Sequence, residues 1–302
     1  MSKSYSFISF LESKDNYNNS STAKLSAEFL NYKKMRLQIE TLSYLHIWSG
    51  MYSEKDGVIY RTFIKSNDRY IIPGSSLKGC IRTVAEMVSY SCMGVAADKQ
   101  TKEKMPVKKW HEDKGRRCIV CDMFGAPGYK SKLIFHDFAV VGEGDFSQIT
   151  ELICIPPSFR PHPHECDDYK DENGKFKGYK IYNHGKCKSA SPDNGIWIEA
   201  IKPGVKFEGE IWFRSDLSQE QIKLLCFSLG LSGFDLKIGY GKNHCLGSIR
   251  ISAVKGVNKF SQYVKECEPE ELIKLAKDFE DEADYKVKEN IKRIKEVWRI
   301  EK

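Results

Sequence analysis

Several features that define large protein classes are missing from this sequence. It has no uninterrupted apolar run of about 18 residues, the length that a helix needs to cross a membrane. The N-terminal segment MSKSYSFISFLESKDNYNNSS has no continuous apolar core, so we do not expect a secretory signal. A phosphate-binding P-loop, a dinucleotide-binding fingerprint and a serine hydrolase elbow are absent as well. These absences favour a cytoplasmic protein outside those enzyme classes.

The composition is that of a folded globular protein. The 302 residues are 41% hydrophobic and 12% aromatic, enough for one large domain with insertions or for two small packed domains. The 48 basic and 41 acidic residues leave a net charge of +7, which fits either a mixed solvated surface or a basic face for a polyanion. In a cytosolic chain, the ten cysteines are expected to be reduced packing residues, metal ligands or catalytic groups.

Hydrophobic periodicity predicts a series of strands and helices. Met35, Leu37 and Ile39 alternate with polar residues, as in a strand with one buried face. Residues 77–88 have apolar side chains at helical spacing, and a capping box at 218–221 starts a second helix. The expected order is strand, helix, strand, insertion, strand, helix and hairpin. This order is the split βαβ pattern of an α+β protein with a ferredoxin-like (RRM-type) core.

Irregular segments divide the rest of the chain. In order, we expect an N-terminal arm (1–33), a core domain (34–255) with two polar insertions (92–132 and 156–195), and a C-terminal segment (256–302). A loop from 49 to 70 is long for a compact domain and is therefore a candidate functional loop. Residues 268–299 read as one long charged helix, whose narrow apolar stripe suggests docking rather than a core position.

The segment IPGSSLKGCIR at 72–82 is the most specific in the chain. A Pro-Gly turn delivers Ser75, Ser76 and the free N–H groups of a helix start, with Ser75 or Ser76 as its cap. Lys78 and Arg82 lie one turn apart on the same helix face. Donors, helix dipole and cations together make a phosphate-backbone site. An ordinary capped helix with two surface cations explains the spacing equally well.

Three segments resemble a known family. LSYLHIWSG at 42–50 is similar to a Leu-His-Ile-Gly-Ser-Gly pattern, IPGSSLKG at 72–79 matches closely, and KIGYGKNHCLGSIRI at 237–251 resembles a C-terminal glycine-rich loop. These are patterns of the RAMP superfamily, the repeat-associated backbone subunits of type III CRISPR effector complexes. The chain departs from them at Trp48, where the family usually has glycine, and at 242–244, which interrupt the glycines.

The resemblance implies that the chain binds CRISPR RNA and target RNA together with other subunits of an effector complex, and no membrane. The helix start at 72–82 and the glycine-rich loop would hold the RNA, because glycines let a backbone approach closely. The residues expected at the RNA from these patterns are His46, Gly239, Gly241, Lys242 and Gly247.

The resemblance also implies a role for the loop between the first strand and the first helix. Catalytic backbone subunits carry an aspartate there that supports cleavage of guide-paired target RNA, and Asp56 is the best match. Its carboxylate could act as a base or hold Mg²⁺ or another divalent ion beside the scissile phosphate. The alternative is a plain Asp-Gly turn, for which this dipeptide is well suited.

A cluster of cysteines and one histidine predicts a metal site in the 92–132 insertion. Cys118 and Cys121 have C-x-x-C spacing, and Cys92 and His111 lie upstream. Together they could form a tetrahedral Cys₃His site for structural Zn²⁺, which would hold an irregular segment in shape. The alternatives are reduced packing side chains or a redox C-x-x-C pair.

The 156–195 insertion has two further patterns. One is a second possible metal site, made by His162, His164, Cys166, His184 and Cys187. The other mixes aromatics with a cation, at Tyr179, Lys180 and Tyr182, as surfaces that contact RNA backbone and bases do. By analogy with the resembling family, the insertion is expected to act as a β-hairpin thumb over the guide–target duplex.

The functional hypotheses are ordered by these motifs. The first is an RNA-binding backbone subunit that cleaves target RNA through Asp56. The second is a subunit that binds RNA without cleaving it, such as a capping subunit. A CRISPR-RNA-processing endonuclease ranks third because no clear His–Tyr pair is in place. The fourth is a zinc-stabilised interaction module without RNA.

Overall fold

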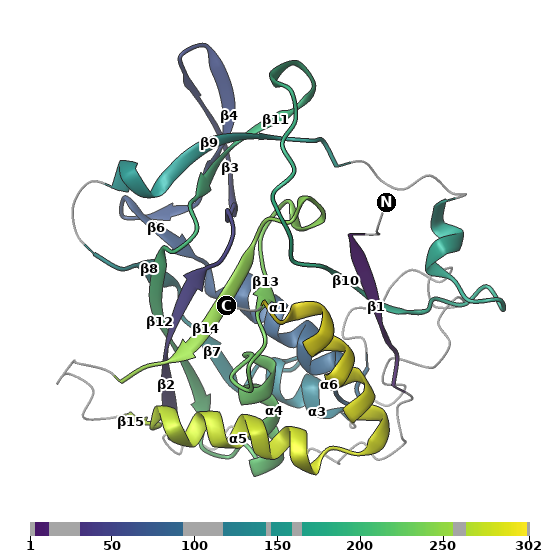
Figure 1. The fold of residues 1–302 in the computed structure, drawn as a ribbon. Coiled ribbons are helices and arrows are strands. Elements are labelled where there is room, and N and C mark those ends of the chain that lie inside the picture. The colour runs from purple at the N-terminus through teal and green to yellow at the C-terminus, as the bar shows by residue number, and fades with distance from the viewer. Residues whose placement is uncertain are drawn as a thin grey trace.

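The computed structural model of the chain describes residues 4–11, 31–92, 117–142, 146–158, 165–255 and 264–300. Its centre is a largely antiparallel sheet of nine strands within these ranges (Figure 1). Four strand positions form the core: β2 (Tyr32–Thr41), the broken strand β7 (Leu133–Phe135) with β8 (Phe138–Val140), β12 (Lys206–Arg214) and β14 (Ser248–Ala253).

The strand order confirms the ferredoxin-like core. β14 pairs with β2, β2 with β12, and β12 with both β7 and β8, all antiparallel. The fourth, first, third and second strands of the split βαβ repeat therefore lie side by side. The sheet is extended by β13 (Leu236–Lys237), β6 (Arg69–Ile72), β5 (Lys65–Ser66) and β15 (Lys265–Glu266).

Two helices cover one face of the sheet. α1 (Gly74–Met87) and α4 (Gln219–Ser228) pack on each other and on the inward side chains of β2 and β12. Alternation in β2 puts Met35, Leu37 and Ile39 in the core, as the sequence predicts. The predicted capping box of α4 is present, since the Ser218 hydroxyl accepts from the Gln221 N–H and the Gln221 carboxamide accepts from the Ser218 N–H.

The opposite face of the sheet carries paired charges beside the ring of Trp212. Lys34 bonds Glu210 at 2.9 Å and Arg36 bonds Glu208 at 3.2 Å, so neighbouring strands neutralise each other. Trp212 donates its indole N–H to the same Glu210 carboxylate at 2.8 Å and meets the ring of His136 edge-on. Within the described ranges this face therefore differs from an RRM sheet, whose exposed aromatic rings stack on bases.

The 49–70 segment is not a loop. It contains the hairpin of β3 (Trp48–Lys55) and β4 (Val58–Phe63), which joins β11 (Ile196–Ile201) and β9 (Thr150–Ile155) in a second sheet. This hairpin projects from the top of the molecule in Figure 1. Nearly all of β3 is exposed, and the usual apolar–polar alternation of a strand is therefore absent from its sequence.

The C-terminal segment is helical but divided. Where one helix was expected from 268 to 299, α5 (Pro269–Glu282) ends and α6 (Tyr285–Trp298) begins, with the Asp284 carboxylate accepting from the Val287 N–H as the cap. Both helices bury apolar side chains in the core, α5 against α4. They are part of the domain and not only a docking element.

The N-terminal strand β1 (Tyr5–Ser9) pairs with β10 (Gly178–Tyr182) of the 156–195 insertion. The insertion folds back on itself between Lys170 and Phe176, and β10 then completes a ribbon with the distant strand β1. A thumb over a guide–target duplex stays a prediction. Short 3₁₀ turns link the strands: Phe146–Ile149, Glu165–Tyr169, Pro192–Asn194 and Lys242–His244. None of the helices in the described ranges combines the length and apolarity of a membrane span.

Candidate nucleic-acid interface

The glycine-rich loop between β13 and β14, residues 238–247, docks on the chain that follows β2. The Tyr240 N–H donates to the His46 carbonyl and the Gly247 N–H to the Tyr44 carbonyl, both at 2.8 Å. Two of the three segments that carry the family resemblance are thus hydrogen-bonded to each other.

The third segment, at the start of α1, meets the same loop from the side. The thiol of Cys80 in α1 lies 3.5 Å from the carbonyl oxygen of Lys237, just before the loop. The Lys242 ammonium is near enough to favour ionisation of Cys80, although burial dominates and raises the pKa of that thiol to about 11. The fold therefore gathers all three segments in one place.

Contacts with the chain itself explain the loop glycines. Gly239 has a φ of 83°, and a Cβ there would lie 2.4 Å from the His46 carbonyl oxygen. Gly247 has a φ of 77°, and its Cβ would lie 1.9 Å from the Ile238 oxygen. Gly241 is also left-handed, with a φ of 74°. These positions need glycine for packing and backbone geometry before any RNA is considered.

The start of α1 is capped by a side chain from another part of the chain rather than by its own residues. Its N-cap residue is Pro73, and neither Ser75 nor Ser76 fills the capping role that the sequence suggested. The Gly74 N–H donates to the Asp137 carboxylate at 2.8 Å, but no hydrogen bond from the N–H of Ser75 or Ser76 is found in the described part of the chain. Ser75 is exposed, so this helix start can accept an anion.

The two cations of α1 have different surroundings. Lys78 is half-buried and has no ion pair within the described ranges, and burial together with neighbouring Arg82 lowers its pKa. Arg82 instead bonds Glu86 at 2.9 Å, the Gly125 carbonyl at 3.0 Å and the Cys121 sulfur at 3.5 Å. Arg82 is therefore engaged in joining α1 to the cysteine segment, and Lys78 is the cation left for a phosphate.

Asp56 lies at the tip of the β3–β4 hairpin. Asp56 has a φ of 51° and Gly57 a φ of 77°, the two left-handed residues of a type I′ turn. The Asp-Gly turn that the sequence offered as an alternative is therefore present. The Asp56 side chain is exposed, and no cluster of metal-ligating groups within the described ranges includes it.

His46 is buried inside the site. Its Nδ1 lies 2.7 Å from the Glu199 carbonyl oxygen, and its Nε2 has no partner in the described structure. Burial lowers the pKa of His46, so the ring is neutral. Its edge meets the rings of Phe63 and Tyr240, which makes it a spacer between the glycine-rich loop and the second sheet.

An aromatic group beside the loop was missed from the sequence. The Arg61 guanidinium stacks on Trp48 at 4.7 Å and on Tyr240 at 5.3 Å from the ring centroids. Trp48 also meets Tyr52 edge-on, and both rings are exposed. The signal was available in Trp48, an aromatic residue where the resembling pattern has glycine.

The aromatic segment of the 156–195 insertion lies at the β1–β10 ribbon. The ring of Tyr179 is buried against Phe10 and is not a stacking surface. The Lys180 ammonium sits over the rings of Tyr5, at 4.3 Å, and Tyr182, at 5.1 Å. These residues stabilise the ribbon, and the structure does not bring them to the glycine-rich loop.

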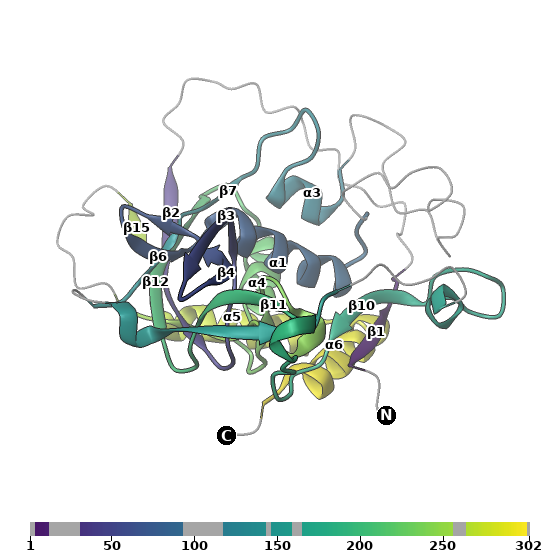
Figure 2. The same ribbon diagram turned by 90° about the horizontal axis from the view of Figure 1, so that it is seen from above.

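Three cysteines come together where α1 meets α3 (Ile119–Phe124), which lies beside it in Figure 2. Cys92, Cys118 and Cys121 are buried, and their sulfur atoms lie within 4.8 Å of one another. Hydrogen bonds with the thiols of Cys118 and Cys92, together with burial, raise the pKa of Cys121, so the thiol stays protonated unless a cation lies among the sulfur atoms. The donor set fits a thiolate-binding metal such as zinc. His111, the predicted fourth ligand, lies outside the described residues.

The second possible metal site is not assembled within the described part. His162 and His164 lie outside it, as does the side chain of Cys166. The Nδ1 of His184 lies 2.8 Å from the Ser248 hydroxyl, and this histidine joins no metal-ligating cluster in the residues that could be searched.

Comparison with known proteins places the chain in a family. The model of the RAMP superfamily matches residues 38–250, which include the segments 42–50 and 72–79 and all but the last residue of 237–251. The chain therefore belongs to the RAMP superfamily, a group of CRISPR-associated RNA-binding proteins. No curated protein sequence matches it significantly.

Proposed function

We propose that this protein is a CRISPR-RNA-binding backbone subunit of a type III effector complex. The observation that carries the proposal is the start of α1, where no hydrogen bond of the Ser75 and Ser76 N–H groups is found within the described ranges and Lys78 has no ion pair there. Cys80 of the same helix lies 3.5 Å from the Lys237 carbonyl oxygen, just before the glycine-rich loop. Lys242 adds a second cation on that loop. Such a site binds phosphates of the RNA backbone, while base pairing by the guide supplies sequence specificity.

The experiment is a binding titration of guide RNA with the double variant Lys78→Ala/Lys242→Ala. We expect at least a tenfold loss of affinity, with the unfolding temperature almost unchanged, because Lys78 has no ion pair among the described residues. Lys274→Ala on the exposed face of α5 is the matched control and should bind normally. Wild-type affinity in the double variant would reject this site.

Zinc is the second part of the proposal. Cys92, Cys118 and Cys121 would bind a structural Zn²⁺, with His111 as the predicted fourth ligand. The ion would supply the positive charge that three clustered thiolates require, and four protein ligands would leave no open position for catalysis. Arg82, whose guanidinium reaches the Cys121 sulfur, would orient the cluster from α1.

Target-RNA cleavage through Asp56 stays a prediction. A reconstituted complex should be assayed with Asp56→Asn, since asparagine tolerates the left-handed φ of 51° and removes only the carboxylate. If cleavage requires the carboxylate and a divalent ion, cuts disappear in the variant and in EDTA while guide and target remain bound. Unchanged cleavage, or none in the wild type, identifies the non-catalytic binding or capping subunit.

A further inference from the structure

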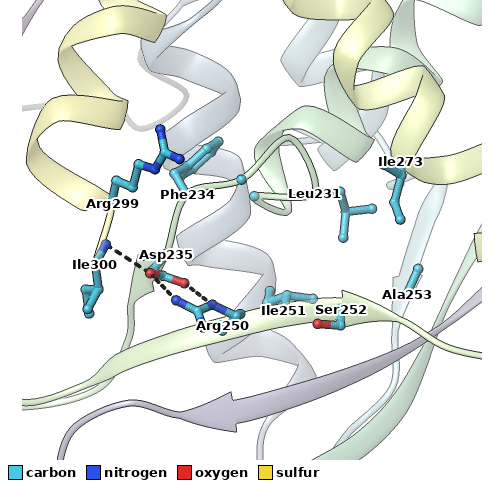
Figure 3. A pocket seen from close by; sticks show the side chains of 12 residues that line it. Leu231, Phe234, Asp235, Arg250, Ile251, Ser252, Ala253, Ile273, Arg299 and Ile300 are labelled. Atoms are coloured by element: carbon cyan, nitrogen blue, oxygen red, sulfur yellow. Dashed lines mark hydrogen bonds and ion pairs between the residues drawn. The ribbon is translucent and has the colours of Figure 1, made fainter. Parts of the chain in front are cut away.

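A cavity of about 640 Å³ lies at the end of β14 that is distant from the glycine-rich loop (Figure 3). It is bounded by the turn before β13, by β14 itself, by α5 and by the chain that leaves α6. Its volume is typical of sites that bind a small molecule or a short peptide.

One wall of the cavity is an unpaired strand edge. β13 pairs with β14 only at Ile249 and Ser248, whereas β14 continues along β2 to Ala253. The Val254 N–H donates to β2, so the N–H and C=O groups of Ile251 and Ala253 point the other way, into the cavity. No hydrogen bond of these groups is found in the part of the chain that the structure describes. Such an edge is a template for another strand.

The facing walls are apolar. Leu231 and Phe234 come from the turn before β13, and Ile273 comes from α5. Ile273 is 37% exposed, whereas the other apolar side chains of α5 pack inward. An extended peptide that pairs with β14 would point alternate side chains at these walls.

The charge at the mouth of the cavity indicates which charge a bound ligand should carry. Asp235 is buried and holds Arg250 through two bonds, at 2.7 and 2.9 Å, and it also accepts the Ile300 N–H. This pair is neutral. Arg299, also at the mouth, has no ion pair among the described residues and leaves the groove positive, which complements a carboxylate.

We propose that this groove, formed by residues 230–235, 250–253 and 273 with Arg299, binds an extended segment of another polypeptide by strand addition to β14. The segment carries alternating apolar side chains and an acidic residue at the end that meets Arg299. A protein partner is favoured over RNA because the free edge offers backbone donors and acceptors in strand register. The inference does not depend on the RNA interface, which lies at the other end of β14.

The test uses a fluorescein-labelled hexapeptide of alternating valine and threonine ending in aspartate, titrated with the full-length protein. We expect saturable binding that weakens at least tenfold when alternate backbone amides of the peptide are N-methylated, because methylation removes strand pairing and keeps the apolar side chains. Arg299→Glu should weaken binding at least tenfold and should prefer a peptide ending in lysine. Lys274→Glu, on the exposed face of α5 and outside the groove, is the control.

Four outcomes overturn the proposal. The first is equal binding of the N-methylated peptide, and the second is no saturable binding of the unmodified one. The third is slow hydrogen exchange at the amides of Ile251 and Ala253 in the free protein, which shows that this chain covers its own edge. Displacement of the peptide by a single-stranded RNA decamer would also reject it, in favour of a nucleic-acid groove.

Discussion

At the scale of the residue, the glycine-rich loop has a structural role of its own in the fold. Gly239 and Gly247 are fixed by close approach to backbone oxygens of this chain. A glycine pattern that the family resemblance connects with RNA therefore has a cause inside the fold. The two causes can be separated by substitution.

Gly239→Ala should destabilise the protein by more than about 1 kcal/mol, since its φ is 83° and its Cβ would meet the His46 oxygen at 2.4 Å. Chemical denaturation of the purified chain measures this change. Gly79→Ala is the control, because Gly79 is within α1 with open space around its Cβ. That variant should be more stable by about 0.5–1 kcal/mol. Equal destabilisation of both variants would contradict the packing explanation.

A buried lysine gives the second prediction at this scale. Lys237 donates to the Leu246 carbonyl at 2.9 Å and has no ion pair within the described ranges, and burial lowers its pKa from 10.5 to about 8. Between those two pH values the unfolded chain binds more protons at this site than the folded chain does. The free energy of unfolding should therefore rise with pH from 8 to 10.5, by up to about 3 kcal/mol from this group.

Lys237→Met should remove this contribution and should stabilise the protein most below pH 8, where the wild-type site is charged in both states. The measurement is the difference in unfolding free energy between the two proteins from pH 7 to 10.5, which cancels other titrating groups. The idea fails if this difference does not change with pH.

At the scale of the element, α3 is a short helix that lies at the cysteine cluster. It spans only Ile119–Phe124, with Cys118 as its N-cap and Cys121 in its first turn. Six residues are too few for a helix to be stable alone, so tertiary contacts hold it: its buried apolar side chains in the core, and Cys121 against Cys92 and Arg82. A metal would make those contacts strong.

The purified protein should therefore contain about one zinc per chain by elemental analysis, and removal of the metal should loosen the α1–α3 contact. Cys121→Ser is expected to lose the metal and to lower the unfolding temperature. Cys226→Ser, at a buried cysteine outside the cluster, can also destabilise but should keep the metal. A metal-free wild-type protein, purified without chelators, would leave the cysteines as packing residues.

Local sequence rules predicted the elements whose signals are local. The alternation in β2 and the capping box of α4 each depend on residues within a few positions of one another, and both are present. The β3–β4 hairpin was missed because both of its faces are exposed, so no alternation marks it. The break between α5 and α6 had one signal, the Asp284 cap, inside an otherwise continuous helical pattern.

At the scale of the whole molecule, what the sequence could not provide is long-range placement. The β1–β10 ribbon joins residues 169 to 177 positions apart, and its pairing buries Tyr179, which the sequence pattern had suggested was a surface residue. Arg82 looked like a partner of Lys78 on one helix face, yet contacts with Gly125 and Cys121 engage it elsewhere. Motif spacing placed both cations on one helix, but only tertiary contacts distinguish Lys78, which has no ion pair within the described ranges, from Arg82, which joins α1 to the cysteine segment.

The distinction between paired and unpaired cations determines how RNA binding should respond to salt. The net charge of +7 is spread over a surface where many cations are paired, so only a few should meet phosphates. Each phosphate neutralised on single-stranded RNA contributes about −0.7 to the slope of log K against log salt. Lys78→Ala/Lys242→Ala should therefore make the slope shallower by about 1.4, whereas Lys274→Ala should leave it unchanged. Titrations of guide RNA at several salt concentrations measure these slopes. A variant that bound weakly with the wild-type slope would have lost folded protein rather than phosphate contacts, and Lys78 and Lys242 would then not lie at the RNA.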